Sequence, residues 1–411
     1  GDFEKMKTAI HYGADAVYAG QPRYSLRVRN NEFSNQNLES AINEAHSQGK
    51  KFYLASNIVA HNNKVKTYLN DLEPVIAAKP DSLIMSDPGL IMMVRETWPD
   101  QVIHLSVQSN VVNHASVKFW QKIGVSRIIL SRELSIEEIA EIREECSNIE
   151  IEVFVHGALC MAYSGRCLLA GYLNHRDANQ GVCTNACRWK YSIKTAKEDE
   201  WGNLIADEVP QLGKGLTVND TFILEEKERP GECMSIEEDA HGTYMFNSKD
   251  LCAIRHVKQF CEIGIDSLKI EGRTKSFFYA ARTAQAYRHA IDDAVAGKTF
   301  DENLLKELEA LTTRGYTDGF YQRQAHEDYQ SYHPKQLNEI SQRFVGEIIN
   351  YDPKTGWADI DVKNHFEVND AIEVMTPEGN HIFNLTAIES MTGEKLTAAP
   401  GGGYQVRIPL S

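Results

Sequence analysis

Residues 122–132, KIGVSRIILSR, contain the unit that decides the fold: the end of a helix-like stretch, a glycine break, and a short β-rich run ending in polar residues. The same succession, with glycine or proline at the break, occurs three more times before residue 274. These copies are HYGADAVYAG (11–20), AKPDSLIMSD (78–87) and EIGIDSLKIEGR (262–273). A helix that repeatedly leads into a short apolar strand is typical of a βα-type fold.

Four further β-rich runs lie between these units: KFYLASN (51–57), VIHLSVQSN (102–110), IEVFVHG (151–157) and TYMFNSK (243–249). The stretches between the runs carry apolar residues at helical spacing, and one of them begins with Ser135 and has Glu138 three residues later, the pattern of a capping box. Strands without polar alternation indicate a parallel sheet covered by helices. No glycine-rich dinucleotide fingerprint follows any run, so we predict a (β/α)8-type barrel rather than a doubly wound sheet.

The start of the chain leaves the strand count open. Residues 2–12 read as a helix that would normally follow a strand, yet nothing precedes Gly1. Either the first strand is missing from this chain, which makes nine candidate strands of which one is not a barrel strand, or the barrel is irregular.

The domain organisation follows from where the repeat stops. We predict a barrel over residues 1–300, with a cysteine-rich loop at 157–190 and an acidic insert at 191–242. Residues 301–342 form a helical or irregular connector. From 343 to 411 short β-rich runs are separated by the turn sequences DPKTG and TPEGN, which predict a small all-β domain.

The net charge of −15 argues at first against a nucleic-acid substrate. However, residues 197–239 carry −9 and residues 343–411 carry −5, so the rest of the chain is nearly neutral. Residues 156–190 carry +3 and residues 267–290 carry +4. If both stretches lie at the barrel mouth they form a basic rim suited to RNA; the alternative is ordinary charge scattered over different faces.

Membrane and secretory classes are not indicated. No apolar run approaches the roughly 18 residues of a membrane span, and no signal-peptide pattern opens the chain. Eight cysteines are too few for a disulfide scaffold, so we expect a cytoplasmic protein with reduced thiols.

The ends of the predicted strands carry the candidate site residues, because parallel barrels place their working groups there. These residues are mostly amides and cations, and as a group they predict a pocket for a small polyanion, with Arg132 and Arg273 able to hold carboxylates. We assign catalytic roles to Glu271, His156 and Gln108, although a core histidine is an open reading of His156. We assign substrate binding to Arg132, Lys269, Arg273, Asn110 and Tyr18.

Four cysteines follow one of these strand ends within 28 residues: Cys160, Cys167, Cys183 and Cys187. Four thiols on loops at a barrel mouth indicate a metal site. The spacing C-x6-C-x15-C-x3-C lacks the C-x2-C knuckles of structural zinc sites, so an iron–sulfur cluster is favoured, and zinc is the alternative.

Several long segments carry a family resemblance: YGADAVYAGQPRYSLRVRN, SDPGLIMMVRE, HLSVQSN, FVHGALCMAYSGRCLLAGYLNHRDANQGVCTNACRWKY, NSKDL and SLKIEGRTKS. They resemble the collagenase-like peptidase superfamily, and most closely its branch of tRNA hydroxylation proteins. The similarity runs over nearly the whole chain.

The resemblance implies a tRNA-modifying enzyme that makes 5-hydroxyuridine at the wobble position without molecular oxygen. It implies prephenate or a similar small dicarboxylate as co-substrate, and an iron–sulfur cluster, expected to be 4Fe-4S, supplied by the iron–sulfur assembly machinery. Carried over to this sequence, the cluster ligands are Cys160, Cys167, Cys183 and Cys187. Members of the family normally begin with a strand ending in a Pro-Ala-Gly turn, of which only Gly1 is present here.

Two other functions stay open at this point. The superfamily name suggests a peptidase, but the chain contains no H-E-x-x-H helix and no G-x-S-x-G elbow, and only Glu271 with His156 offers a way to activate water on a metal. The other possibility is a noncatalytic scaffold in which the cluster only stabilises the fold.

Overall fold

The computed structural model describes residues 2–26, 33–159, 249–272, 275–311, 315–322 and 342–410, together with the backbones of five short strands between 196 and 244. The four candidate cluster cysteines and Arg273 lie outside the described residues.

Seven strands form a parallel sheet that curves into a barrel. They are β1 (Ala16–Gly20), β2 (Lys51–Ser56), β3 (Ser82–Met85), β4 (Ile103–Leu105), β5 (Arg127–Ile129), β6 (Glu150–Ala158) and β13 (Ser267–Ile270). Each strand pairs in parallel with the next in this order. The predicted fold class is therefore confirmed. A first strand would fall before Gly1, so that part of the prediction stays a prediction.

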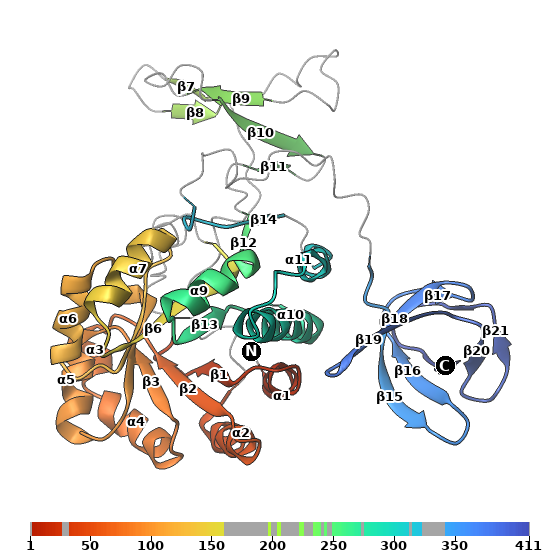
Figure 1. The fold of residues 1–411 in the computed structure, drawn as a ribbon, viewed down its shortest axis with the longest axis horizontal. Helices are drawn as coiled ribbons and strands as arrows, with labels where there is room; N and C mark the ends of the chain where they lie inside the picture. The colour runs from red at the N-terminus through yellow and green to blue at the C-terminus, as the bar shows by residue number, and fades with distance from the viewer. Residues whose placement is uncertain are drawn as a thin grey trace.

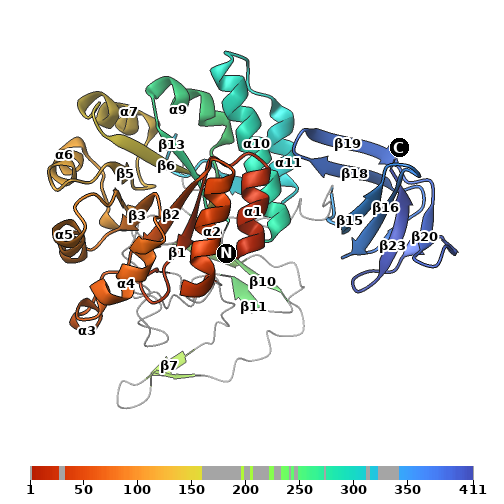
Figure 2. The ribbon, with the colours of Figure 1, turned by 90° about the horizontal axis from the view of Figure 1, so that it is seen from below.

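Helices surround the strands on the outside of the barrel (Figure 2). They are α1 (Phe3–His11), α2 (Asn35–Ser47), α3 (Asn62–Val65), α4 (Tyr68–Ala77), α5 (Pro88–Thr97), α6 (His114–Lys122), α7 (Ile136–Glu145), α9 (Val257–Ile263), α10 (Phe277–Val295) and α11 (Glu302–Glu309). The capping box predicted at Ser135 and Glu138 is present at the start of α7. Outward-facing strand residues such as Phe52, Leu54 and Leu83 are fully buried beneath these helices, which explains the apolar, unalternating strands.

One predicted barrel strand is wrong. Residues 243–249 read as a strand of the parallel sheet, but β11 (Gly242–Tyr244) pairs antiparallel with β10 (Cys233–Asp239) in a separate small sheet. The β-rich composition predicts an extended backbone and contains no information about its partner. The other short strands of the insert are β7 (Ala196–Glu198), β8 (Leu204–Ala206) and β9 (Phe222–Glu225).

Two short strands extend the sheet beyond β6. The strand β12 (Asp250–Cys252) pairs antiparallel with the last residues of β6, and β14 (Tyr316–Thr317) pairs in parallel with β12. Residues 315–322 therefore lie against the barrel, and Tyr321 donates a hydrogen bond from its hydroxyl to the Phe154 carbonyl of β6.

The C-terminal residues form an antiparallel β-domain with its own core beside α10 and α11 (Figures 1 and 2). Its strands are β15 (Gly346–Asp352), β16 (Trp357–Val362), β17 (Phe366–Glu367), β18 (Ala371–Thr376), β19 (Gly379–Asn384), β20 (Ile388–Ser390), β21 (Lys395–Leu396), β22 (Ala398–Ala399) and β23 (Gln405–Pro409). The β18–β19 hairpin contacts the barrel, where Arg282 of α10 makes two hydrogen bonds to the Glu373 carboxylate, at 3.1 and 2.9 Å.

Candidate active site at the carboxyl ends of the strands

The carboxyl ends of the parallel strands meet at one end of the barrel, and polar residues follow them. These residues include Gln21 after β1, Asn57 after β2, Ser86 and Asp87 after β3, Ser106 after β4, Ser131 and Arg132 after β5, and Glu271 after β13. Figure 1 shows β6 running toward this end, where the described chain stops at Leu159, one residue before Cys160. The described chain therefore reaches the barrel mouth directly before the first candidate cluster ligand.

Uncharged side chains follow the ends of β1, β2, β4 and β5, and we call this group the polar arc: Gln21, Ser25, Asn57, Ser106, Gln108, Asn110 and Ser131. The Asn57 side chain accepts a hydrogen bond from the Leu26 amide at 3.1 Å and donates one to Ser106 Oγ at 3.2 Å. Ser106 Oγ in turn accepts from the Gln108 amide at 3.4 Å. The Asn57 side chain thus joins the segment after β1, the end of β2 and the end of β4.

Gln108 and Asn110 lie together in this arc. Gln108 belongs to the 3-10 turn η2 (Val107–Ser109), and Asn110 closes the turn in the left-handed conformation, with φ 52° and ψ 51°. Asparagine adopts this conformation more easily than most residues. The Asn110 side chain donates to the Gln108 carbonyl at 3.1 Å. The structure brings these two predicted residues together, and their roles stay predictions.

Arg132 and Glu271 form an ion pair at the same end of the barrel. The guanidinium donates to Glu271 Oε2 at 2.8 Å and to the Ala158 carbonyl at 2.7 Å, and it lies 3.9 Å from the centre of the Phe154 ring. The Glu271 amide donates to the His156 carbonyl at 2.9 Å. Arg132 therefore holds the end of β6 against the end of β13, immediately before the cysteine-rich segment.

Lys269 lies inside the barrel. Its ammonium is 2.6 Å from Glu152 Oε1, and Arg127 donates to the other oxygen of Glu152 at 3.0 Å. The Lys269 ammonium also lies 4.1 Å from the centre of the Tyr18 ring, so β13 and β1 are in contact through their side chains. Lys269 and Tyr18, both predicted to bind substrate, thus contact each other.

Burial and neighbouring charges together set the pKa values of two side chains in the barrel interior, Glu152 and His104. Burial alone would raise the pKa of Glu152, but the charge and hydrogen bond of Lys269, together with the charge of Arg127, lower it to about 2. Burial, with the charge of Arg127, lowers the pKa of His104 to about 3, so this histidine is neutral and its ring accepts or donates a hydrogen bond with Ser82 at 3.0 Å. Glu152 stays ionised because two cations face it.

His156 is fully buried and is surrounded by the rings of Tyr279, Tyr287 and Tyr316. Its ring nitrogens lie 3.4 Å from the Tyr287 hydroxyl and 3.3 Å from the Tyr316 hydroxyl. Burial lowers its pKa to about 3, so the imidazole is neutral. These contacts are those of a core histidine, and the catalytic assignment of His156 stays a prediction.

Two basic residues of the stretch 267–290, Arg282 and Arg288, do not take part in a rim at the mouth. Arg282 pairs with Glu373 of the C-terminal domain, and Arg288 pairs with Asp15 and Asp292. Both arginines belong to α10 on the outside of the barrel. A sum of charges over a segment cannot show which of its residues lie on an outer helix and which lie at the strand ends.

The proposed cysteine site rests on the donor atoms in the sequence, because its four cysteines lie outside the described residues. Among the described residues no group of three or more His, Cys, Asp or Glu side chains is placed to hold a metal ion. The four thiols after Leu159 match the donor set of an iron–sulfur cluster and equally that of zinc.

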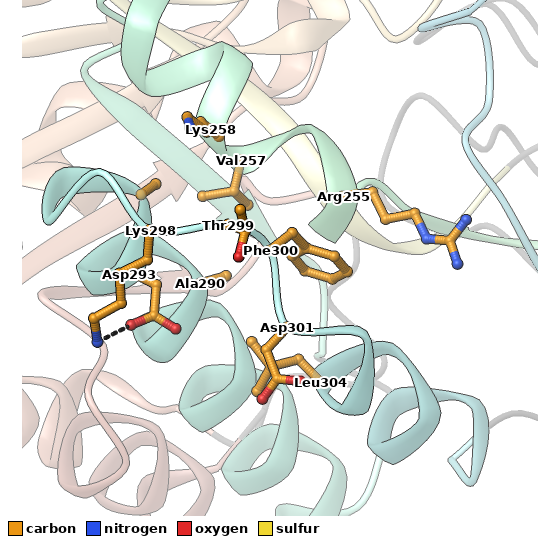
Figure 3. Close-up of a pocket in the computed structure, with 11 residues that line it drawn as sticks. Arg255, Val257, Lys258, Ala290, Asp293, Lys298, Thr299, Phe300, Asp301 and Leu304 are labelled. Atoms are coloured by element: carbon orange, nitrogen blue, oxygen red, sulfur yellow. Dashed lines mark hydrogen bonds and ion pairs between the residues drawn. The ribbon is translucent and has the colours of Figure 1, made fainter.

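A pocket on the outside of the barrel is separate from this site. It lies between α9, α10 and the start of α11, and Val257, Phe300 and Leu304 are among its lining residues (Figure 3). Lys298 at its edge pairs with Asp293 at 2.7 Å. No strand end contributes to its lining, so we do not assign it to the reaction.

The interior residues Glu152, Arg127 and His104 were missing from the site predicted by sequence. Alternate residues of a barrel strand point to the axis. A charged residue inside an otherwise apolar strand, such as Glu152 in IEVFV, was the signal that could have identified them.

Two family models cover the chain. The model described as Peptidase family U32 matches residues 1–331, and that of the Peptidase family U32 C-terminal domain matches residues 341–411. The chain belongs to peptidase family U32. The two U32 matches divide the chain between the barrel and the C-terminal β-domain.

Curated relatives place this U32 chain in one branch. It is 57% identical over 418 residues to tRNA hydroxylation protein P of Escherichia coli K12, with 100% of this chain and 92% of that protein covered. It is 55% identical to the Haemophilus influenzae protein of the same name, with 99% and 91% covered. The resemblance seen in the sequence is therefore confirmed.

A solved structure, the C-terminal domain of a Geobacillus thermoleovorans U32 protein, is 32% identical with a TM-score of 0.16, and covers 16% of this chain and 78% of that one. Within the described parts of the U32 chain, no helix has the length and apolar character needed to cross a bilayer.

Proposed function

We propose that this protein hydroxylates tRNA. The observation that carries the proposal is the 57% identity, over the whole chain, to a protein named for tRNA hydroxylation. A barrel whose strand ends carry amides, hydroxyls and an arginine–glutamate pair is compatible with recognition of a nucleotide extruded from a loop.

The finer proposal is that the target is a wobble uridine and the product 5-hydroxyuridine, with prephenate or a similar dicarboxylate as donor. In this exchange the base gains one oxygen atom and loses two electrons, while the donor loses that oxygen and gains the electrons. Arg132 and Arg273 are proposed to receive the donor carboxylates, with Lys269 adding positive charge from the barrel interior. On binding of the donor, the ion pair between Arg132 and Glu271 would be replaced by one between Arg132 and a donor carboxylate.

We also propose that Cys160, Cys167, Cys183 and Cys187 hold an iron–sulfur cluster, supplied by the iron–sulfur assembly machinery. Bound at the mouth, it would supply electron-transfer or Lewis-acid chemistry. The residues of the described chain have other tasks: Arg132 fixes the end of β6, two residues before Cys160, and the polar arc offers uncharged hydrogen-bonding groups.

An assay with purified components tests the reaction. Protein purified without oxygen is incubated with tRNA from cells that lack the gene, with and without prephenate, and the nucleosides are analysed by mass spectrometry. We expect a uridine that has gained one oxygen atom only when prephenate is present. Oxygen gain without prephenate would reject the donor, and no gain with any added dicarboxylate would reject the reaction.

Metal analysis tests the cofactor. Iron, sulfide and zinc are measured in anaerobically purified protein together with its absorption spectrum. About four irons per chain are expected for a 4Fe-4S cluster. Stoichiometric zinc without iron would reject the iron–sulfur proposal.

A peptidase is the second candidate, because the family description names one. The pair that could activate water does not favour it: Glu271 is held by Arg132, and His156 is enclosed by tyrosines and neutral. Gelatin cleavage by the pure protein, abolished by Glu271→Gln, would support this candidate.

A further inference from the structure

Four buried polar atoms of the polar arc have no hydrogen-bond partner among the described residues: Gln21 Oε1, Ser25 Oγ, Asn110 Oδ1 and Ser131 Oγ. Gln21, Ser25 and Ser131 are only 1%, 3% and 3% exposed. Buried polar atoms in proteins are nearly always hydrogen-bonded. Four unpartnered polar atoms at one end of a barrel therefore indicate that a ligand forms the missing hydrogen bonds.

The backbone of these residues is held firmly by strand-end contacts. The Gln21 amide donates to the Ala55 carbonyl at 2.8 Å, and the Gln21 carbonyl accepts from the Ser25 amide at 3.1 Å. On the other side, the Ser131 amide donates to the carbonyl of Val111, the residue after Asn110, at 3.2 Å. The unpartnered side chains therefore start from fixed positions, as a preorganised site requires.

Contacts already described connect the two ends of the arc. The segment that contains Gln21 and Ser25 continues to Leu26, whose amide donates to the Asn57 side chain. Hydrogen bonds then connect Asn57 with Ser106, Ser106 with Gln108, and Gln108 with Asn110. Asn57, Gln108 and Asn110 are partly exposed, so the arc is open to solvent on this side.

The chemistry of the arc is uncharged. Two amide oxygens accept hydrogen bonds, and two serine hydroxyls donate or accept them. A uracil edge presents one N–H between two carbonyl oxygens, which an amide oxygen and two hydroxyls complement. The carboxylates of the oxygen donor would not form hydrogen bonds with amide oxygens, because both groups are acceptors. The cation that could bind them, Arg132, lies near the ends of β5, β6 and β13 and pairs with Glu271.

We propose that the polar arc is the subsite for the target base, with Gln21, Ser25 and Ser131 as base-contacting residues. The inference rests on the proposed function, because it assigns the uridine of that reaction to the ends of β1, β4 and β5. The charged ends of β5, β6 and β13 are then left for the anionic donor. Specificity for uracil over cytosine follows, since cytosine has a ring acceptor where uracil has its N–H.

The test uses the full chain with Ser25→Ala, Ser131→Ala and the double substitution. Ser126→Ala is the matched control, because Ser126 Oγ donates to the Ile103 carbonyl at the opposite end of the barrel. Uridine and cytidine are the probes, and their binding is measured by saturation-transfer NMR. Each arc variant should bind uridine about five- to tenfold more weakly, while Ser126→Ala binds as the wild type does.

Thermal unfolding separates a binding role from a structural one. If the two serine hydroxyls form their hydrogen bonds only with a bound ligand, they are unsatisfied in the ligand-free protein. Their removal should then raise the Tm of the ligand-free protein by about 2 °C. A lowered Tm, unchanged uridine binding, or equal binding of uridine and cytidine would overturn the proposal.

Cells that lack the gene distinguish failure of the subsite from failure of the function. If the wild-type chain restores tRNA hydroxylation and the double variant does so equally well, the subsite is wrong and the function stands. If the wild-type chain restores nothing, the proposed function itself fails.

Discussion

At the scale of single residues, Glu152 is the centre of the barrel interior. Its side chain is 2% exposed and faces both Lys269 and Arg127. Removing one member of such a buried group leaves uncompensated charge in a poorly solvated place. The Glu152→Ala substitution should therefore lower the free energy of unfolding by about 3–5 kcal/mol, measured by urea denaturation. Glu150→Ala is the control. Within the described part of the chain the half-exposed Glu150 forms an ion pair only with Arg127, so its substitution should cost less than about 1 kcal/mol.

The same carboxylate predicts a pH dependence. The pKa of Glu152 falls from its ordinary value of 4.5 to about 2 in the folded protein, so its ionised form stabilises the fold above pH 4.5. This contribution should disappear as the pH falls from about 4.5 to about 2. The difference in unfolding free energy between the wild type and Glu152→Gln, measured across this range, should shrink toward low pH. A difference independent of pH would contradict the assignment.

Sequence showed which residues follow the strands and did not show what they contact. Lys269 and Arg132 were expected to offer free charge to an anion. Their partners, Glu152 and Glu271, are 117 and 139 residues away in the chain. Contacts across a barrel depend on strand register, which local patterns do not encode.

At the scale of elements, the ends of β6 and β13 are packed backbone to backbone at Gly157. This glycine has φ +120°, and a Cβ atom placed on it would lie 2.6 Å from the Glu271 carbonyl oxygen. The Gly157→Ala substitution should therefore separate the two strand ends, lower the unfolding free energy by about 1–3 kcal/mol, and reduce tRNA hydroxylation.

Gly49→Ala is the matched control for this substitution. Gly49 also has a positive φ, +68°, but a Cβ atom there would meet nothing within 4 Å. Its cost should be confined to the backbone conformation, about 1 kcal/mol, with normal tRNA hydroxylation. Equal effects of the two substitutions on hydroxylation would show that the contact with Glu271 is unimportant.

Elements with a strong local signal were predicted correctly. The capping box of α7 was present in the sequence as Ser135 and Glu138, and the structure has both of its hydrogen bonds. The run at 243–249 failed because a strand signal does not specify which strand pairs with it or in which direction.

At the scale of the whole molecule, Arg282 joins the two domains. It is 2% exposed on α10 and pairs with Glu373 at 2.9 Å and with Glu307 at 3.4 Å. The Glu373→Ala substitution removes its closest partner, so the C-terminal domain should detach at lower temperature and give a separate transition in calorimetry. Glu378→Ala, an exposed change on the same hairpin, should leave the calorimetric profile unchanged. A Glu373→Ala profile identical to that of the wild type would contradict this role of Arg282.

The most direct test of the account is the nucleoside composition of tRNA from cells that lack this gene. We predict that 5-hydroxyuridine and its derivatives disappear from the digested tRNA. They should return with the wild-type chain and stay absent with Cys187→Ala. An unchanged nucleoside profile in the deletion strain would contradict the proposed function.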